Sequence, residues 1–428
     1  PGIPAPAYGA VSREADLISI FEPSAGLHMD FGQCALPISG AVAMTELVID
    51  LAQPENWEAA FTIFGITGEP ADDFGPGSDR FFDLEMWAWN VDLKRLLVER
   101  ALDEPMIVPM PDLGGEPFRP LMVWSYPRPD DPLLHDMVAS HAPRPALAFF
   151  QVDSLGAPNV VDLAGIEPYC QEGTGKSLGP VMDLVYDPVG EHFYAAFHGS
   201  NDIWRISRDG TVRERAWPPP EPGGYEDAID CSWRTMALAL RKSHEDPAHM
   251  RLYAADSAGA RLRVMVPATT PGGDAVLEPA PLQRMILDGI PYALTTGRFA
   301  TSNDAGTAVT GEHLYAATQN GLVVVDVTAY NPNLLPGVHA FRRVGEVPVP
   351  SNQGGPQSLI TSDNFELLGT PDTVVLADAH KDLVRFYTAG EEEFMLADIT
   401  IGATVPRLTS SYRGSRLFLT DALSNTVQ

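Results

Sequence analysis

An internal repeat constrains the fold of this chain more than any other feature of its sequence. The repeated segment is an apolar strand, a polar turn and a second apolar strand, in units of roughly 50–65 residues, a period typical of repeat architectures. We therefore expect similar β units packed against one another. Four copies align without a gap: YAAFHGSNDI (194–203), YAADSAGARL (253–262), VLADAHKDLV (375–384) and FLTDALSNTV (418–427).

A proline marks the start of several units. It leads into an apolar strand about a dozen residues before the repeated segment, and proline suits a strand entry because it has no N–H to donate. With Gly- and Pro-rich turns between strands, each unit is predicted to hold four short strands. Four-stranded units around an axis are the architecture of the β-propeller. The marker prolines are Pro180, Pro291, Pro356 and Pro406.

The units are predicted to form an all-β, seven-bladed β-propeller of four-stranded antiparallel blades. The last unit stops at residue 428 with its strands incomplete, whereas residues 15–32 contain two strands that belong to no full unit. We expect these N-terminal strands to complete the last blade with 406–428, because ring closure removes an exposed sheet edge. Residues 15–428 then form one domain, and the Pro/Ala-rich residues 1–14 form a tether. Blades are expected to begin near residues 44, 120, 180, 234, 291, 356 and 406.

Two segments carry a resemblance to a known class of repeats. GPVMDLVYDPVGEHFYAAFHGSNDIWRI (179–206) and VPRLTSSYRGSRLFLTDALSNTVQ (405–428) follow one order: Pro, apolar strand, Gly turn, apolar pair with Ala or Thr and Asp or Asn, polar turn, apolar strand. This order resembles the YVTN/NHL class of propeller repeats, best over residues 150–428. The resemblance implies a fold and not a reaction, because that class includes scaffolds, ligand binders, lactonases and subunits of periplasmic oxidoreductases.

Composition limits the partners. The formal net charge of −29 argues against nucleic acid and anionic membranes, since both select basic surfaces. Apolar runs are of strand length, so we expect no transmembrane segment. The chain opens on PGIPAPAYGA without an initiator Met, which is typical of a processed start. We therefore predict an extracytoplasmic protein: periplasmic, surface-attached or secreted.

Acidic residues recur at one position of the repeat. Four units end their second strand on an aspartate, at the edge of the ring where a propeller usually binds ligands. One interpretation is a ring of carboxylates that holds a cation, for which calcium suits oxygen ligands. The alternative is a set of Asx turns, in which each carboxylate accepts hydrogen bonds from its own loop. The four aspartates are Asp153, Asp256, Asp378 and Asp421. His198 and His380 lie near matching turns of separate blades, so a copper or zinc site at the axis is a second interpretation, with solvent-facing histidines as its alternative. The candidates for a metal site are Asp256, Asp378, His380 and Asp421, and Glu167 and Asp230 join Asp256, Asp378 and His380 as candidates if the rim belongs to a metal-dependent enzyme.

The three cysteines all precede the first strand of a predicted blade. Cys170 and Cys231 belong to adjacent blades, so they are candidates for a disulfide that leaves Cys34 free. Three separately buried thiols are the alternative. None of the cysteines forms a CxxC pair, so a zinc site of the usual spacing is not expected.

The long loop PPPEPGGYEDAIDCSWRT (218–235) gathers aromatic, acidic and basic side chains between two blades. Such a loop suits recognition of a polar ligand or a partner surface, and structural filler is the alternative. Its candidate binding residues are Tyr225, Glu226, Asp227, Asp230, Trp233 and Arg234.

No catalytic constellation accompanies the repeat, and the sequence identifies no cofactor. The favoured function is therefore a non-enzymatic binding or scaffold propeller that presents its loop-rich rim to a protein partner or a polar ligand, alone or within a surface or periplasmic assembly. The alternative is a metal-dependent propeller enzyme or enzyme subunit, a lactonase-like hydrolase or periplasmic oxidoreductase, with its site at the axial rim.

Overall fold

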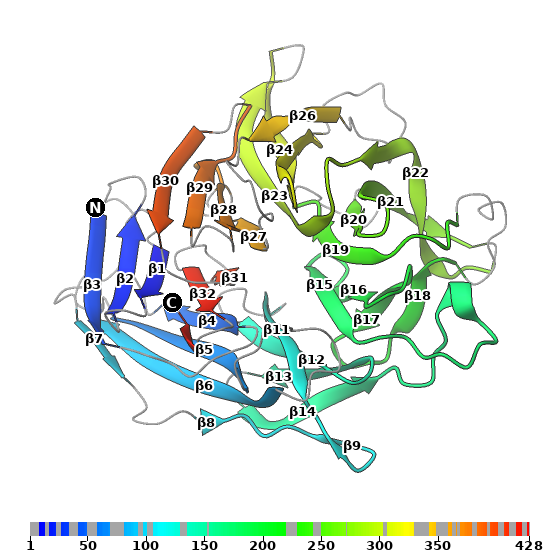
Figure 1. The fold of residues 1–428 in the computed structure, drawn as a ribbon, viewed down its shortest axis with the longest axis horizontal. Helices are drawn as coiled ribbons and strands as arrows, with labels where there is room; N and C mark the ends of the chain where they lie inside the picture. The colour runs from blue at the N-terminus through cyan, green and yellow to red at the C-terminus, as the bar shows by residue number, and fades with distance from the viewer. Residues whose placement is uncertain are drawn as a thin grey trace.

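Five antiparallel sheets of four strands stand side by side around an axis in the computed structural model (Figure 1). In each sheet the strands follow one another in chain order, from the innermost to the outermost. The first sheet is β11 (Pro120–Pro127), β12 (His135–His141), β13 (Ala146–Gln151) and β14 (Ser154–Asp162). The second is β15 (Val181–Asp187), β16 (His192–Phe197), β17 (Ile203–Ser207) and β18 (Arg213–Trp217). The third is β19 (Thr235–Leu240), β20 (Leu252–Asp256), β21 (Arg261–Thr269) and β22 (Ala275–Ile286). The fourth is β23 (Pro291–Ser302), β24 (Ala308–Thr318), β25 (Gly321–Asp326) and β26 (Arg342–Val347), and the fifth is β27 (Ser358–Thr361), β28 (Thr373–Asp378), β29 (Leu383–Thr388) and β30 (Phe394–Thr400).

The structure describes part of the chain. Side chains are described within 108–391, and the rest is described as backbone strands. The described residues are 8–12, 17–22, 27–33, 42–48, 58–68, 81–92, 97–100, 106–128, 135–151, 154–219, 229–242, 250–270, 272–302, 306–328, 342–347, 358–361, 365, 369–378, 383–391, 394–400, 406–410, 417–421 and 426–427.

Further sheets flank these five blades. The segment 1–14, predicted as a tether, contains β1, which pairs antiparallel with β2. One sheet is β1 (Tyr8–Ser12), β2 (Leu17–Glu22) and β3 (Leu27–Gln33), and another is β31 (Pro406–Ser410), β32 (Leu417–Asp421) and β33 (Thr426–Val427). A third is β4 (Val42–Val48), β5 (Glu58–Gly68), β6 (Phe81–Asp92) and β7 (Leu97–Arg100), with β8 (Met106–Ile107) also paired to β6. A short hairpin joins β9 (Asp112–Leu113) to β10 (Glu116–Pro117).

The second strand of a blade is buried on both faces, which explains its apolar sequence. Successive side chains of a strand point to opposite faces. In β16, Phe193 and Ala195 pack toward the preceding blade, whereas Tyr194 and Ala196 pack toward the following one. Strands β20 and β24 divide their side chains in the same way. The repeated Tyr-Ala-Ala therefore places one aromatic ring in each junction, beside small residues that let neighbouring sheets approach.

Polar contacts add to this packing near the axis. Asp183 on the innermost strand β15 accepts a hydrogen bond from the Leu238 amide of β19 (2.7 Å), in the next blade. Lys242, which follows β19, donates through Nζ to the Thr361 hydroxyl at the end of β27 (2.9 Å). These bonds join inner strands of different blades at fixed positions.

The prediction of an all-β propeller with four-stranded antiparallel blades is confirmed by this topology. Within the described residues, no helix combines the length and the apolar character that crossing a bilayer requires.

Candidate functional site

The candidate site is the edge of the ring where blade-to-blade connections meet the turns between second and third strands; we call it the upper rim. Backbone hydrogen bonds join these two kinds of loop. The Ser257 amide donates to the Arg234 carbonyl (3.0 Å), and the Gln319 amide donates to the Ile290 carbonyl (3.0 Å). One bond also connects blades, from the Thr235 amide to the Ser200 carbonyl (2.9 Å). At the upper rim, these bonds hold the loops of the β19–β22 and β23–β26 blades in place and join the β15–β18 blade to the β19–β22 blade.

A disulfide joins two of these connections. Cys170 lies between β14 and β15, Cys231 lies between β18 and β19, and their Cα atoms are 5.5 Å apart. This is the pair expected from their positions in adjacent blades. The bond encloses the whole β15–β18 blade, because its two ends precede and follow that blade. Cys34 lies outside the described residues.

The loop after Cys170 is exposed but held in one conformation. The Glu167 carboxylate accepts hydrogen bonds from the Gly173 amide and from the Gly175 amide (2.8 Å). Both glycines have positive φ (77° and 71°), a backbone conformation that other residues rarely adopt. Glu167 therefore orders this loop, and its carboxylate is engaged within the protein.

Arg215 anchors the same loop from the outer strand β18. Its Nε lies 2.9 Å from Asp202, and its other nitrogens reach the Glu172 carboxylate (3.0 Å) and the Glu167 carbonyl (2.9 Å). Burial raises the pKa of Asp202, which is 1% exposed, while Ser200 and Arg215 oppose the rise. A guanidinium shared among three oxygen atoms fixes the geometry of this part of the rim.

Asp230 and Asp256 share Arg261. Arg261 Nε donates to Asp256 (2.6 Å), and a second nitrogen contacts Asp230. Asp256 is fully buried and also accepts from the Arg234 amide (2.6 Å) and the Ala258 amide (3.0 Å). These contacts agree with the Asx-turn interpretation, because the carboxylate oxygens accept hydrogen bonds from loop amides and from an arginine.

Asp230 forms an Asx turn of its own. It accepts from the Ser232 amide (2.9 Å) and hydroxyl (2.6 Å). The hydrogen bonds from Ser232, followed by Arg261, lower the pKa of Asp230 to about 2. The carboxylate is thus ionised at neutral pH and stabilises the connection before β19.

Trp233 and Arg234 support the rim from within. Trp233 is 1% exposed, and the Arg263 guanidinium lies 4.0 Å from its ring centroid, a cation–π contact. Arg234 donates to the carbonyls of Cys231 (2.8 Å) and Trp233 (2.7 Å). Both side chains are therefore parts of the scaffold of the rim.

The remaining predicted site residues stay predictions. Asp378 and Asp421 end the strands β28 and β32, but their side chains are outside the described part of the chain. His198 is exposed at the turn after β16. Among the described residues, no group of three or more His, Cys, Asp or Glu side chains is placed to hold a metal ion. Outside the described residues lie Asp153, Tyr225, Glu226, Asp227 and His380.

The structure adds an exposed apolar site that the sequence reasoning missed. Ile286, the last residue of β22, is 78% exposed, and Ile290 is 38% exposed. Ile286 pairs across the sheet with Arg261, so the two side chains lie on the same face. The sequence Met285–Ile286–Leu287 could have predicted this exposure. Side chains alternate between the two faces of a strand, and both neighbours of Ile286 face the core between blades.

Comparisons with known proteins assign no family and no role to this chain. No family model matches the sequence, so the resemblance to the YVTN/NHL class remains a prediction. No curated protein matches the sequence either. One solved structure that matches is the beta-propeller domain of Cps50 (Swd1) from Myceliophteria thermophila, with 11% identity, 86% of this chain and 91% of that chain covered, and a TM-score of 0.49.

Two further structures overlap at similar levels. Virginiamycin B lyase from Staphylococcus aureus has 11% identity over 90% of this chain and 98% of its own, with a TM-score of 0.43. The dihydro-heme d1 dehydrogenase NirN has 13% identity over 99% of this chain and 77% of its own, with a TM-score of 0.46. At these values the fold assignment rests on the sheet topology described above.

Proposed function

We propose that this chain is an extracytoplasmic, non-enzymatic β-propeller that presents its upper rim to a protein partner. The observation that carries the proposal is Ile286, a large apolar side chain that is 78% exposed on a rim otherwise fixed by charged groups. Of the three large apolar side chains exposed among the described residues, Ile286 and Ile290 lie here, in and next to the β22–β23 connection, and Val189 lies elsewhere.

An apolar anchor ringed by polar groups is the usual composition of a protein-binding surface. Arg261 (26% exposed) lies opposite Ile286 in the sheet, and its ion-pair partner Asp230 is 38% exposed, so a partner can meet both charges with hydrogen bonds. Their own ion pair holds them in place before any partner arrives. Preorganisation of this kind reduces the entropy that association costs.

An oxidising compartment is proposed from the disulfide. Bonds such as Cys170–Cys231 form and persist outside the cytoplasm, whereas cytosolic thiols are kept reduced. The test is alkylation of free thiols in the source cells, followed by mass spectrometry of the two cysteine peptides. Recovery of both cysteines in alkylated form would contradict this localisation.

We also propose that the complete ring has seven blades, closed by the N-terminal strands. The sheets of β4–β7 and β31–β33 support the two additional blades. The position of β1 beside β32 supports closure of the ring by both ends of the chain.

The protein-binding role is tested with a matched pair of variants. Ile286→Asp places a charge on the upper rim, and Val189→Asp places the same charge in the β15–β16 turn, where Val189 is 38% exposed. The tagged proteins are cross-linked in extracts of the source cells, and captured proteins are quantified. We expect one protein that is captured by the wild type and by Val189→Asp and is reduced about tenfold or more by Ile286→Asp, as for a central anchor residue. Capture that Ile286→Asp leaves unchanged would overturn the proposal.

Nothing in the described residues favours the metal-dependent alternative, because Asp256 already serves Arg261 and two loop amides. Metal analysis of the purified protein addresses the ligand candidates outside the described side chains. A tightly held stoichiometric metal would favour that alternative over a binding role.

A further inference from the structure

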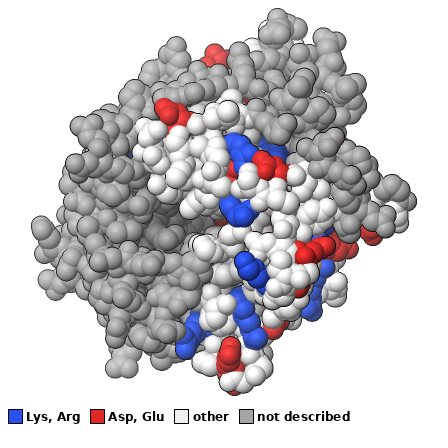
Figure 2. Space-filling view, turned by 45° about the vertical axis from the view of Figure 1, so that its right-hand side comes forward, with Lys and Arg blue, Asp and Glu red and all other residues white. Residues whose placement is uncertain are grey.

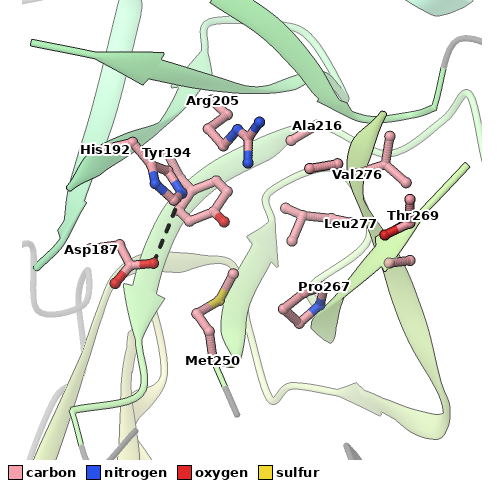
Figure 3. A pocket seen from close by; sticks show the side chains of 12 residues that line it. Asp187, His192, Tyr194, Arg205, Ala216, Met250, Pro267, Thr269, Val276 and Leu277 are labelled. Atoms are coloured by element: carbon pink, nitrogen blue, oxygen red, sulfur yellow. Dashed lines mark ion pairs between the residues drawn. The ribbon is translucent and has the colours of Figure 1, made fainter. Parts of the chain in front are cut away.

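A cavity of about 340 Å³ lies between the β15–β18 and β19–β22 blades (Figure 3). It is at the end of these strands opposite the upper rim, near the β15–β16 turn and the β21–β22 turn. Its volume is in the range of small-molecule sites. One wall comes from each blade, and the two walls differ in chemistry.

Tyr194 brings a hydroxyl group to the wall formed by the β15–β18 blade. It lies on β16, and its ring packs edge-on against His192, two residues earlier on the same face of the strand, with 4.9 Å between the ring centroids. Figure 3 shows the Tyr194 hydroxyl pointing into the space between the walls. The residue as a whole is 4% exposed, so this hydroxyl is a polar group of the interior.

The Tyr194 hydroxyl is available to a ligand. Among the described residues it forms no hydrogen bond, and its oxygen is open to the cavity rather than enclosed by protein atoms. Burial raises the pKa of Tyr194, so the group keeps its proton at neutral pH and offers an O–H donor. A donor in the interior without an acceptor costs free energy, and an acceptor on a ligand recovers that cost.

The two charged side chains on this wall are engaged within the protein. Arg205, on β17, donates through Nη2 to the Glu214 carboxylate on β18 (2.5 Å), and Asp187 Oδ1 accepts from the Val189 amide (3.0 Å). Recognition through the Tyr194 hydroxyl therefore needs no charge on the ligand.

The wall from the β19–β22 blade is apolar. Figure 3 shows Met250, Pro267, Val276 and Leu277 facing the β15–β18 wall across the cavity. Burial of a hydrocarbon body against such a surface is favourable. Burial of an ion against it is costly, because hydrocarbon groups cannot replace the water around a charge. The apolar wall therefore favours an uncharged ligand.

We propose that this cavity binds a small uncharged carbonyl compound, whose oxygen accepts from the Tyr194 hydroxyl and whose apolar body packs against Leu277 and its neighbours. A carbonyl group suits this donor because it only accepts, so the ligand buries no donor of its own against the apolar wall. Recognition of this compound is separate from the upper rim, so either proposal stands without the other.

Two compounds of one shape test the hydrogen bond: acetophenone, and α-methylstyrene, in which a CH₂ group replaces the carbonyl oxygen. Each is titrated into the full chain of the wild type and of Tyr194→Phe, and binding is followed by calorimetry and by NMR. We expect the variant to bind acetophenone about fivefold more weakly, the effect of one neutral hydrogen bond, and to bind α-methylstyrene no more weakly than the wild type. An equal loss for both compounds, or no binding of acetophenone by the wild type at millimolar concentration, would overturn the proposal.

Two further variants locate the binding. Tyr186→Phe removes a hydroxyl from the same blade at its other junction, where Tyr186 packs against Tyr126 and Phe193, and it is expected to leave acetophenone binding unchanged. Ala268→Phe places a ring in the cavity from the apolar wall, where Ala268 is half-buried. We expect the Ala268→Phe variant to keep the circular dichroism spectrum of the wild type and to lose binding of both compounds. Undiminished binding in this variant would place the ligand elsewhere and contradict the proposal.

Charged analogues test the preference for an uncharged ligand. Benzoate and benzylamine have bodies similar to that of acetophenone, and at pH 7 they carry opposite charges. We expect both to bind the wild type more weakly than acetophenone does, because the apolar wall cannot solvate an ion. Tighter binding of either ion than of acetophenone would show that the cavity selects a charge, and the proposal would then be wrong.

Discussion

Three carboxylates of this propeller differ in the groups that stabilise their negative charge. Asp256 has Arg261 and two amides, and Asp202 has Arg215, Ser200 and the Tyr169 amide. Among the described residues, the groups that donate hydrogen bonds to Asp183 are backbone amides: its oxygens accept from Leu184 (2.9 Å) and from Leu238 (2.7 Å). A carboxylate without a cation depends more strongly on its solvation.

This difference makes a prediction about pH. Burial raises the pKa of Asp183 to about 6, although the two amides oppose the rise. Between pH 4 and 6 the folded state then binds a proton that the unfolded state has released, so this group lowers stability as pH rises through that window. Two pKa units correspond to a loss on the order of 3 kcal/mol by pH 7.

Asp183→Asn isolates the effect, since its amide oxygen still accepts from Leu238. Urea unfolding of both proteins at several pH values is expected to show the variant gaining relative stability from pH 4 to 7. A difference between the two unfolding free energies that does not vary with pH would contradict the assignment.

Elements of this protein are stable through their neighbours. A four-stranded blade buries both faces of β16, β20 or β24 only when another blade stands on each side. Aromatic residues fill the junctions, as where Phe193 lies 4.8 Å from Tyr126 and 5.3 Å from Phe149, ring centroid to ring centroid. The disulfide also stabilises a single blade, because it joins the two connections that precede and follow β15–β18.

Removal of that disulfide is predicted to destabilise the ring measurably. The two cysteines are 61 residues apart, and a loop of this size contributes about 4 kcal/mol in the chain-entropy model, with about 2–4 typical. The Cys170→Ser, Cys231→Ser double variant should therefore unfold at lower urea concentration than the oxidised wild type. Reductant is expected to shift the wild type and not the variant; equal shifts would show that the bond contributes nothing.

The whole molecule combines a strong net charge with local charge pairing. Figure 2 shows Lys and Arg side chains scattered among Asp and Glu over the described face, rather than gathered alone. Ion pairs also join blades below the surface, as where Arg208, which follows β17, lies 3.1 Å from the buried Asp136 of β12. Basic groups therefore serve the fold here, while the excess of acidic residues sets the long-range field.

Closure of the ring by both ends of the chain makes a prediction about the stability of the whole molecule. The proposal that both ends of the chain share a blade predicts that deletion of residues 1–33, which removes β1 to β3, leaves an unprotected sheet edge. We expect the shortened chain to melt at lower temperature and to aggregate. Deletion of residues 1–7, which precede β1, is the control and should change neither property. A 1–33 deletion that melts like the full chain would refute closure.

The four-stranded blade was predictable from residue order without any coordinates. Strand alternation, turn residues and the prolines at the entry of strands are local signals, and they repeat; Pro291 opens β23 and Pro406 opens β31. The pairing of Cys170 with Cys231 could be expected for the same reason, since adjacent units place equivalent connections side by side.

Which side chains meet across the ring depends instead on how the blades pack. Arg261 holds Asp230 from 31 residues away, and Lys242 reaches Thr361 across 119 residues. The cavity beside Asp187 is lined by residues of two neighbouring blades, and Ile286 is exposed because nothing in the described structure packs over that end of β22. Such contacts depend on the angle and spacing of packed blades, which no local pattern of residues encodes.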